Sequence, residues 1–108
     1  MQTLSPELIK EMVDRIVTTL RPEAIYLYGS HAYGHPHRDS DVDLCVVVGN
    51  SDLPSHKRAI AAYRALRGLL VPAEIKVVTR EEFELRAQWL SSIERVVKEK
   101  GQSLYEAS

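Results

Sequence analysis

The stretch between Tyr26 and Val48 constrains the fold of this chain more than any other, because it joins two apolar runs through a polar loop. The first run, Ala24–Tyr28, is short and rich in β-branched and aromatic residues, which favours a strand that stops at Gly29. The second run, Val42–Val48, is apolar almost throughout and is typical of a buried strand. The sequence therefore predicts two strands, and the loop between them carries the candidate site.

Gly29 and Ser30 open this loop in a way that suits a phosphate. Glycine lets the backbone turn without a Cβ penalty and approach a phosphate closely, and Ser30 adds a hydroxyl. If residues 30–33 begin a helical turn, their free N–H groups point at one spot, which favours an anion such as a triphosphate. The pair alone is a weak signal, because most Gly-Ser pairs are ordinary turns.

Asp41 and Asp43 stand two residues apart at the start of the second strand. The period of two in a strand places both side chains on the same face. Two neighbouring carboxylates repel each other unless a cation lies between them. Hard oxygen ligands of this kind suit Mg²⁺ or Mn²⁺, which take their remaining ligands from water and phosphates.

Other interpretations of the loop residues stay open. Asp39, Ser40 and Asp41 could be turn and cap residues, which is the commoner role of Asp and Ser in loops. His35 and His37 have the spacing of a zinc pair, but no third ligand at suitable spacing accompanies them, so zinc is disfavoured. These histidines and His31 are better interpreted as exposed loop residues, and Arg38 as either a phosphate contact or a solvated arginine.

Together the loop and its strands resemble the signature of the DNA polymerase β-like nucleotidyltransferase superfamily, in its smallest form, the minimal nucleotidyltransferases. Both halves of the signature occur in order, Gly29-Ser30-x-Ala32-x-Gly34 and then Ser40-Asp41-x-Asp43-Leu44. The resemblance extends over nearly the whole chain, to a closing helix and a terminal Leu-Tyr-Glu. It implies an α/β (α+β) fold with a mixed β-sheet of three or more strands flanked by helices, and residues 1–108 as a single nucleotidyltransferase domain.

The resemblance also implies a set of site residues. The catalytic and metal-binding acids would hold two Mg²⁺ ions, or Mn²⁺, and are Asp41, Asp43 and Glu74. The nucleotide-binding residues would be Gly29 and Ser30 at the β and γ phosphates, and Ser40, which shapes the loop that presents the first acid. Arg38 is added to them as the candidate phosphate contact named above.

Glu74 belongs to a predicted third strand, Val71–Thr79, on the same face as Lys76. If this strand lies beside Val42–Val48, Glu74 completes a triad of carboxylates. The resembled family usually has Asp at this position, and Glu is longer by a methylene. The alternative is that Glu74 pairs with Lys76 or an arginine at the mouth of the strand.

Helical patterns flank the strands. Ser5-Pro6 is typical of a helix start, and the helix that follows ends at Arg21-Pro22 and carries an apolar stripe of Leu8, Ile9, Met12, Val13, Ile16, Val17 and Leu20. A second helix is expected roughly over residues 53–70, facing the sheet through Ile60, Tyr63, Leu66 and Leu70. The form Thr79-x-x-Glu82 is that of a capping box. It begins a helical region that is interrupted near Ser91-Ser92 and ends at Gly101, and Leu104-Tyr105 is expected to dock the tail that follows. The residues expected to pack this region against the core are Phe83, Ala87, Trp89, Leu90, Ile93, Val96 and Val97.

The second helix is also basic, and its charges are expected on a solvated face or edge, at His56, Lys57, Arg58, Arg64 and Arg67. The alternative is that Lys57 or Arg58 reaches a phosphate or an acidic partner.

Composition narrows the class of protein. A chain of 108 residues with 44% hydrophobic residues can bury one core. A formal net charge of -1 gives no sign of nucleic-acid binding by bulk electrostatics, which normally needs a basic surplus. The single Cys45 forms no internal disulfide, which suits a reducing cytoplasm. No signal peptide and no apolar run of transmembrane length is evident, so no membrane partner is expected.

The function implied by the resemblance is the transfer of a nucleoside monophosphate, AMP from ATP, onto a hydroxyl. The chain has no second domain to bind an acceptor. Minimal nucleotidyltransferases that look like this one often act beside a HEPN-domain toxin and adenylylate one of its tyrosines, so the expected role is that of the antitoxin. The alternatives are a non-catalytic binding antitoxin, which the Glu at position 74 keeps open, and a small-molecule or RNA nucleotidyltransferase with a separate acceptor subunit. A homo-oligomer is also compatible with the sequence.

Overall fold

The computed structural model describes residues 5–33 and 41–107. Their elements, in chain order, are α1 (Pro6–Leu20), β1 (Ala24–Tyr28), α2 (Ser30–Tyr33), β2 (Val42–Val48), α3 (Ser55–Ala65), β3 (Ala73–Thr79), α4 (Arg80–Arg86), α5 (Ile93–Lys100) and β4 (Gln102–Glu106). Within these residues, none of the helices has the length and apolar character needed to cross a bilayer.

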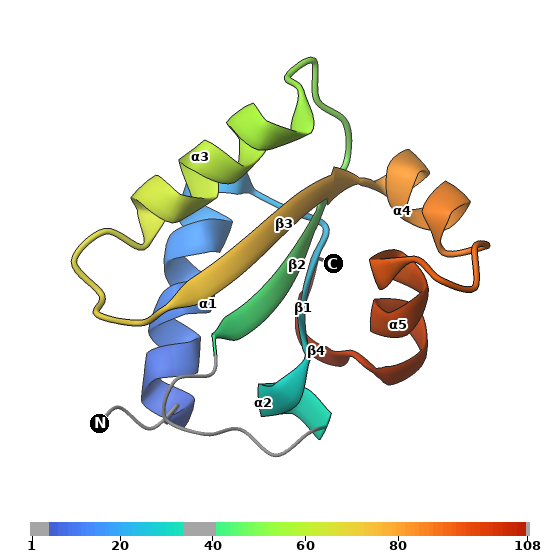
Figure 1. The fold of residues 1–108 in the computed structure, drawn as a ribbon. Helices are drawn as coiled ribbons and strands as arrows, with labels where there is room; N and C mark the ends of the chain where they lie inside the picture. The colour runs from blue at the N-terminus through green and yellow to red at the C-terminus, as the bar shows by residue number, and fades with distance from the viewer. Residues whose placement is uncertain (1–4, 34–40, 108) are drawn as a thin grey trace.

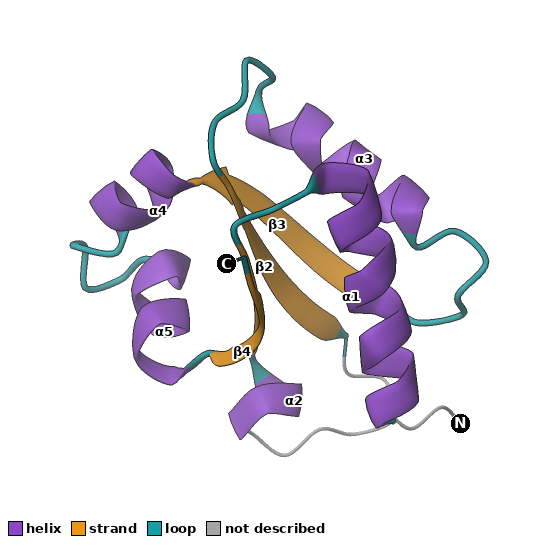
Figure 2. Cartoon of the chain, turned by 180° about the vertical axis from the view of Figure 1, so that it is seen from behind, coloured by secondary structure: helices purple, strands orange, loops and turns teal. Residues whose placement is uncertain are grey.

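The strands form one mixed sheet of four, in the order β3-β2-β1-β4. β1 runs antiparallel to both β2 and β4, and β2 runs parallel to β3. Helices α1 and α3 lie on one side of the sheet and α4 and α5 on the other, which Figures 1 and 2 show from opposite directions. The predicted α/β fold with a mixed sheet flanked by helices is therefore confirmed.

The alternation of side chains along β2 divides the core into two parts. Leu44 and Val46 belong to the cluster that α1 and α3 cover, whereas Cys45 and Val47 belong to the cluster on the side of α4 and α5. Burial raises the pKa of the Cys45 thiol to about 12, so it stays protonated and acts as a small apolar side chain. β2 is thus buried on both faces, which explains its nearly continuous apolar sequence.

Helix α1 begins and ends as its sequence predicts. The Ser5 hydroxyl accepts a hydrogen bond of 3.1 Å from the backbone N–H of Leu8, and Pro6 is the first helical residue. At the other end, Arg21 adopts a left-handed conformation and its N–H donates to the carbonyl of Val17.

The prediction for the second helix is partly wrong. α3 covers residues 55–65 rather than 53–70, and of the four residues expected to face the sheet only Leu66 is buried, whereas Ile60, Tyr63 and Leu70 are exposed. The buried residues of the helix are Arg58 and Ala62. α3 therefore faces the sheet through a different set of side chains than predicted, namely the small Ala62 and the charged Arg58.

Arg58 is the larger departure, because only 8% of it is exposed. Its Nη1 and Nη2 atoms donate to Oε1 and Oε2 of Glu82 at 2.8 and 3.2 Å, and its Nε donates to the carbonyl of Leu53 at 2.9 Å. The interpretation of a solvated position is wrong for Arg58. The alternative, contact with an acidic partner, is confirmed within the chain itself.

The outer edge of β3 is occupied by side chains. The backbone N–H of Ile75 donates to the Tyr63 hydroxyl at 2.9 Å, the carbonyl of Val77 accepts from Arg58 at 3.3 Å, and the N–H of Thr79 donates to Glu82 at 3.0 Å. Backbone groups that an edge strand would otherwise present to solvent therefore find partners on α3 and α4.

The closing region combines confirmed and wrong predictions. Thr79 and Glu82 form the predicted capping box, and the expected break is present, since Ser92 caps the start of α5. Phe83, Ala87 and Val97 are buried as predicted, but Trp89, Leu90 and Ile93 are exposed. They lie at the turn between α4 and α5 and at the start of α5, where no part of the described chain covers them. Leu104 and Tyr105 dock on the core as expected, but within a fourth strand that the sequence did not predict.

Glu82 should give the fold a pH dependence that can be measured. The hydrogen bonds from Arg58, together with one from Thr79, lower the pKa of Glu82 from an ordinary 4.5 to about 2. Because the folded-state pKa is the lower one, the stabilisation is complete above about 4.5 and is lost as the pH falls towards 2. We expect Glu82→Gln to be less stable at neutral pH and to lose this part of the pH dependence in denaturant titrations. Glu81→Gln, an exposed neighbour in the same turn, is the matched control, and equal behaviour of the two variants would contradict the assignment.

Candidate active site

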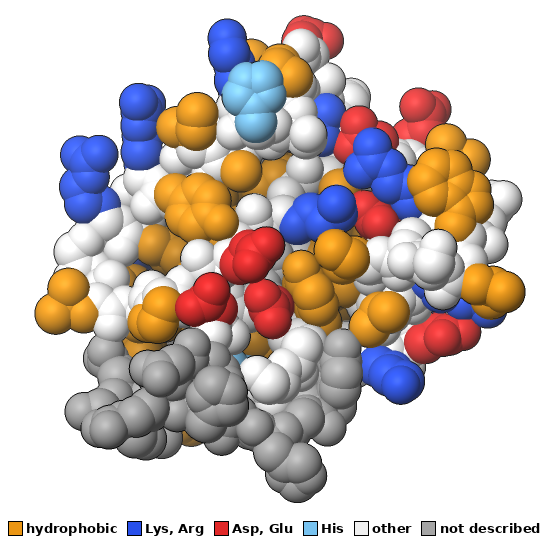
Figure 3. Space-filling model, in the orientation of Figure 1, with side chains coloured by type: hydrophobic (Ala, Val, Ile, Leu, Met, Phe, Trp, Pro, Cys, Tyr) orange, Lys and Arg blue, Asp and Glu red, His pale blue; other side chains and the backbone are white. Residues whose placement is uncertain are grey.

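The predicted acids meet across neighbouring strands. In the parallel register of β2 and β3, Asp43 lies opposite Glu74, and in the antiparallel register of β1 and β2 it lies opposite Tyr28. Side chains at paired positions point to the same face, here the one that α4 and α5 cover. Asp41 is exposed and lies two residues before Asp43. Figure 3 shows acidic side chains gathered near the centre of this surface.

The pKa of Asp43 lies above its ordinary value. Burial raises its pKa, and the charges of Glu74 and Asp41 raise it further, whereas His31 opposes them. Both of the other acids are therefore close enough to repel the charge on Asp43. The three acids therefore lie near one another at this end of the sheet, and ionising Asp43 beside the other two costs free energy.

The Gly-Ser turn lies directly against Asp43. Gly29 has a φ of +78°, and a Cβ added there would overlap the Oδ2 atom of Asp43. Ser30 begins the short helix α2, and the N–H of Ala32 donates to the carbonyl of Gly29 at 3.0 Å. Residues 30–33 therefore form a helical turn, which is the condition under which their free N–H groups would point at one spot. Glycine is needed at position 29 both for its backbone conformation and for the close approach of the carboxylate.

The oxygen donors of the acids fit a hard divalent cation in their chemistry. A cation between Asp43 and its two neighbours would remove the repulsion that raises the pKa of Asp43. Across residues 5–33 and 41–107, however, no group of three His, Cys, Asp or Glu side chains is arranged so that it could hold a metal ion by itself. A bound Mg²⁺ would take part of its ligands from phosphate oxygens and water, as Mg²⁺ usually does in proteins.

Some predicted residues cannot be placed. Arg38 and Ser40, proposed as nucleotide contacts, lie outside the described residues, as do His35 and His37. Their roles stay predictions.

A buried charge cluster beside the acids was not predicted. Glu94 on α5 is only 2% exposed, and its Oε2 atom lies 3.5 Å from Lys76 Nζ and 3.5 Å from Arg86 Nη1. Within the described part of the chain, Lys76 forms its ion pair with Glu94 and not with Glu74, so the alternative pairing of Glu74 with Lys76 is not observed. The sequence indicated that Lys76 shares a face with Glu74, but α5 and α4 reach it only through the tertiary fold.

The mixed sheet, the neighbouring carboxylates and the Gly-Ser turn are the features that the sequence predicted for a nucleotidyltransferase domain. The family model of the nucleotidyltransferase domain matches residues 7–104, and the chain belongs to this family. No curated protein sequence matches the chain significantly.

Solved structures share the fold. A protein assigned as a nucleotidyltransferase from Sulfolobus solfataricus superposes with a TM-score of 0.66 at 22% identity, over 93% of this chain and 78% of the other. A toxin–antitoxin complex with AMP-PNP gives a TM-score of 0.64 at 20% identity, over 93% of this chain and 74% of the other. A variant of the MntA–HpeT toxin–antitoxin gives 0.62 at 18% identity, with the same coverage of 93% and 74%. At these identities the similarity establishes the common fold.

Two glycines allow the contact between Gly29 and Asp43 to be tested. Gly29 and Gly68 both have a positive φ, but a Cβ at Gly68 would meet nothing within 4 Å. We expect Gly68→Ala to cost about 1–2 kcal/mol through backbone strain alone. Gly29→Ala should cost roughly 1–3 kcal/mol more, because the methyl group overlaps a carboxylate. Denaturant unfolding of both variants measures the difference, and Asp43→Ala in the Gly29→Ala background should recover it. Equal losses in the two glycine variants would contradict the contact.

Proposed function

We propose that this nucleotidyltransferase domain moves AMP from ATP onto a tyrosine hydroxyl of a HEPN-domain toxin, and so acts as the antitoxin of a pair in the cytoplasm. The observation that carries the proposal is the row formed by Gly29, Asp43 and Glu74, with Asp41 close enough to raise the pKa of Asp43. It brings a glycine turn that suits a phosphate and three carboxylates to one end of one sheet. Two of the structures with this fold are toxin–antitoxin complexes, one of them with AMP-PNP, which supports the choice of nucleotide and partner.

Each residue of the candidate site has its own role in the proposed transfer of AMP. Gly29 and Ser30 would hold the β and γ phosphates at the start of α2, and Asp41 and Asp43 would face the α-phosphate. Two divalent cations bound by the acids would neutralise the triphosphate and lower the pKa of the attacking hydroxyl. The tyrosyl oxygen forms a bond to the α-phosphorus while the bond from that phosphorus to the bridging oxygen of the β-phosphate breaks. Pyrophosphate takes the electron pair of the broken bond, and the Glu74 carboxylate receives the proton of the phenol.

A second candidate function is an antitoxin that neutralises its partner by binding alone. It is favoured by the absence, among the described residues, of three side chains arranged to hold a metal ion by themselves. It is also favoured by Glu74, which stands where the resembled family usually has Asp.

Ligand binding gives the first test. We expect Mg²⁺ and ATP together to raise the Tm by more than the sum of their separate effects. The acids and the triphosphate are all negatively charged, and they repel each other unless a cation lies between them. A ligand at a hundred times its dissociation constant adds about 2.7 kcal/mol of stability, which is roughly 10 °C for a domain of this size. Asp43→Asn should abolish the joint effect, whereas Asp52→Asn, an exposed acid in the loop before α3, should not. An unchanged melting curve of folded wild-type protein with saturating Mg-ATP would count against a nucleotide site.

Substitutions at Glu74 give the second test, with transfer of labelled AMP to the co-purified toxin as the readout. Glu74→Gln should reduce the transfer rate at least about 100-fold, the usual scale of a lost general base, with little change in ATP binding. Glu74→Asp should retain or raise activity.

The double variant Asp41→Asn, Asp43→Asn separates the two candidate functions. If it still neutralises the toxin in cells as well as the wild type does, catalysis is dispensable and the binding antitoxin replaces the enzyme.

A further inference from the structure

A buried carboxylate near the acids faces two cations at once. The Oε2 atom of Glu94 lies 3.5 Å from Lys76 Nζ and 3.5 Å from Arg86 Nη1, and within the described residues it accepts no hydrogen bond. A single carboxylate balances the charge of one cation and not of two. Either cation can therefore move away while Glu94, which is only 2% exposed, keeps a charged partner.

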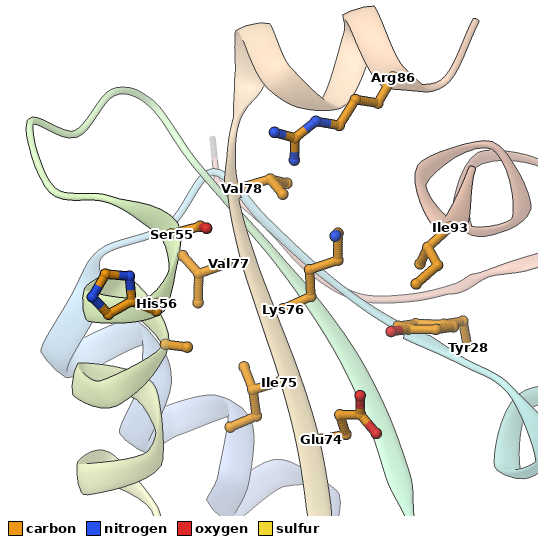
Figure 4. A pocket seen from close by; sticks show the side chains of 11 residues that line it. Tyr28, Ser55, His56, Glu74, Ile75, Lys76, Val77, Val78, Arg86 and Ile93 are labelled. Carbon is orange, nitrogen blue, oxygen red and sulfur yellow. The ribbon is translucent and has the colours of Figure 1, made fainter. Parts of the chain in front are cut away.

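Lys76 is the one of the two cations that lies on the same strand as a site residue. It follows Glu74 by two residues in β3, so both side chains point to the same face, with their Cα atoms about 6.6 Å apart. The Lys76 side chain is 34% exposed, and with Glu74 it lines a hollow of about 280 Å³ at the outer strand. In Figure 4 its amine points away from Glu74, towards Arg86. Because the four-carbon stem of lysine is flexible, rotation of the side chain alone can turn the amine towards the acids.

We propose that Lys76 exchanges partners when the nucleotide binds: it leaves Glu94 and binds a phosphate oxygen of the nucleotide, while Arg86 stays with Glu94. The proposal rests on the proposed function. It adds a phosphate-binding residue to the site, together with the ion pairs that control its release.

The charges at the site favour this exchange once a nucleotide is bound. Asp41, Asp43 and Glu74 already lie near one another, and a triphosphate adds further negative charge beside them. Divalent cations would balance part of this charge, and an amine within reach is attracted to the rest. An amine donates to a phosphate oxygen in a charge-assisted hydrogen bond of about 2.8 Å, whereas the contact of Lys76 with Glu94 is 3.5 Å long and is not a hydrogen bond. The exchange therefore replaces a long ion pair by a stronger contact.

Arg86 makes the exchange possible, because it stays with Glu94. A buried carboxylate that loses its last charged partner destabilises a protein strongly. With Arg86 present, Glu94 keeps one ion pair after Lys76 has left. Without Arg86, the release of Lys76 would leave Glu94 with no ion pair among the described residues, so Lys76 would be held in place. Glu94 thus competes with the phosphate for Lys76, and Arg86 weakens that competition.

The affinity for Mg-ATP, measured by isothermal titration calorimetry on the folded protein, tests the exchange. Lys76→Gln should weaken binding by about tenfold or more, the usual consequence of losing a charge-assisted contact. Glu94→Gln should strengthen binding, because Lys76 is then no longer held. Arg86→Gln should weaken binding, although Arg86 itself does not touch the nucleotide. A cluster that merely supports the fold would shift the affinity in the same direction in all three variants.

Matched variants and a second ligand assign the effect to the charge of Lys76 and to phosphate. Lys76→Arg keeps the charge and should retain most of the affinity. Arg64→Gln removes an exposed cation of α3, on the other side of the sheet, and should leave the affinity unchanged. Inorganic triphosphate with Mg²⁺ should give the same order of affinities, because the contact is to phosphate and not to the base.

A double variant keeps the test valid if Arg86→Gln does not fold. Lys76→Gln added to Glu94→Gln contains no buried carboxylate without a partner at this cluster. The added substitution should abolish the gain in affinity that Glu94→Gln produces. A gain that persists in the double variant would contradict the release of Lys76.

The outcomes separate the exchange from the reaction. An unchanged Mg-ATP affinity in Lys76→Gln, or a lower affinity in folded Glu94→Gln, overturns the exchange. An order of affinities seen with ATP but not with inorganic triphosphate overturns the contact with phosphate. If the folded wild type binds neither ligand, the exchange and the nucleotide site fail together.

Transfer of labelled AMP to the co-purified toxin completes the separation. If the affinities follow the expected order but the toxin receives no AMP, the exchange stands and the proposed function fails. If the toxin receives AMP and Lys76→Gln neither weakens ATP binding nor raises the KM for ATP, the proposed function stands and the exchange fails.

Discussion

The register between β2 and β3 is the constraint on which the candidate site depends. It places Asp43 opposite Glu74, and a shift by one residue would turn one of the two carboxylates into the apolar layer under α1 and α3. The apolar residues that alternate with the acids enforce this register, because Leu44 and Ile75 must face the same core. Hydrophobic burial therefore supplies the free energy that holds two like charges side by side. Burial first, and then the repulsion between these like charges, raise the pKa of Asp43.

Glu94 is a second carboxylate whose position in the fold costs free energy. Burying a carboxylate is costly unless it is paired, and its two ion pairs at 3.5 Å are long for full compensation. Replacing such a cluster by apolar residues is often neutral or stabilising in proteins. Glu94 joins β3 to α4 through these two ion pairs, with Lys76 and with Arg86.

Much of the fold follows from local sequence signals. The caps at Ser5 and Thr79, the turn at Gly29 and the strands with their buried and polar faces could all be predicted, because each rests on residues a few positions apart. The neighbouring acids of the site could also be predicted once the third strand was placed beside the second. The sequence did not reveal the fourth strand, because Gln102–Glu106 is too polar to show a strand pattern.

The errors at Arg58 and Glu94 have a common cause. Ile60 and Tyr63 of the second helix were expected to face the sheet, whereas the buried residues of α3 are Arg58 and Ala62. Arg58 could be buried only because Glu82, 24 residues further along the chain, meets it. The same holds for Glu94, whose partners come from β3 and α4. Charged residues whose partners are distant in sequence look like surface residues, and only the tertiary fold identifies them as buried.

The side chains along the outer edge of β3 also limit how this protein can assemble. An open edge strand can recruit a strand from another molecule, and a fibre grows only when both edges of the sheet accept one. Tyr63, Arg58 and Glu82 bind backbone groups at successive outward positions of β3. A second copy could then add its strand only at β4, where a symmetric pair closes on itself and stops at two. Continuous addition of strands would first require α3 to leave the edge of β3. The helix therefore hinders amyloid-like growth.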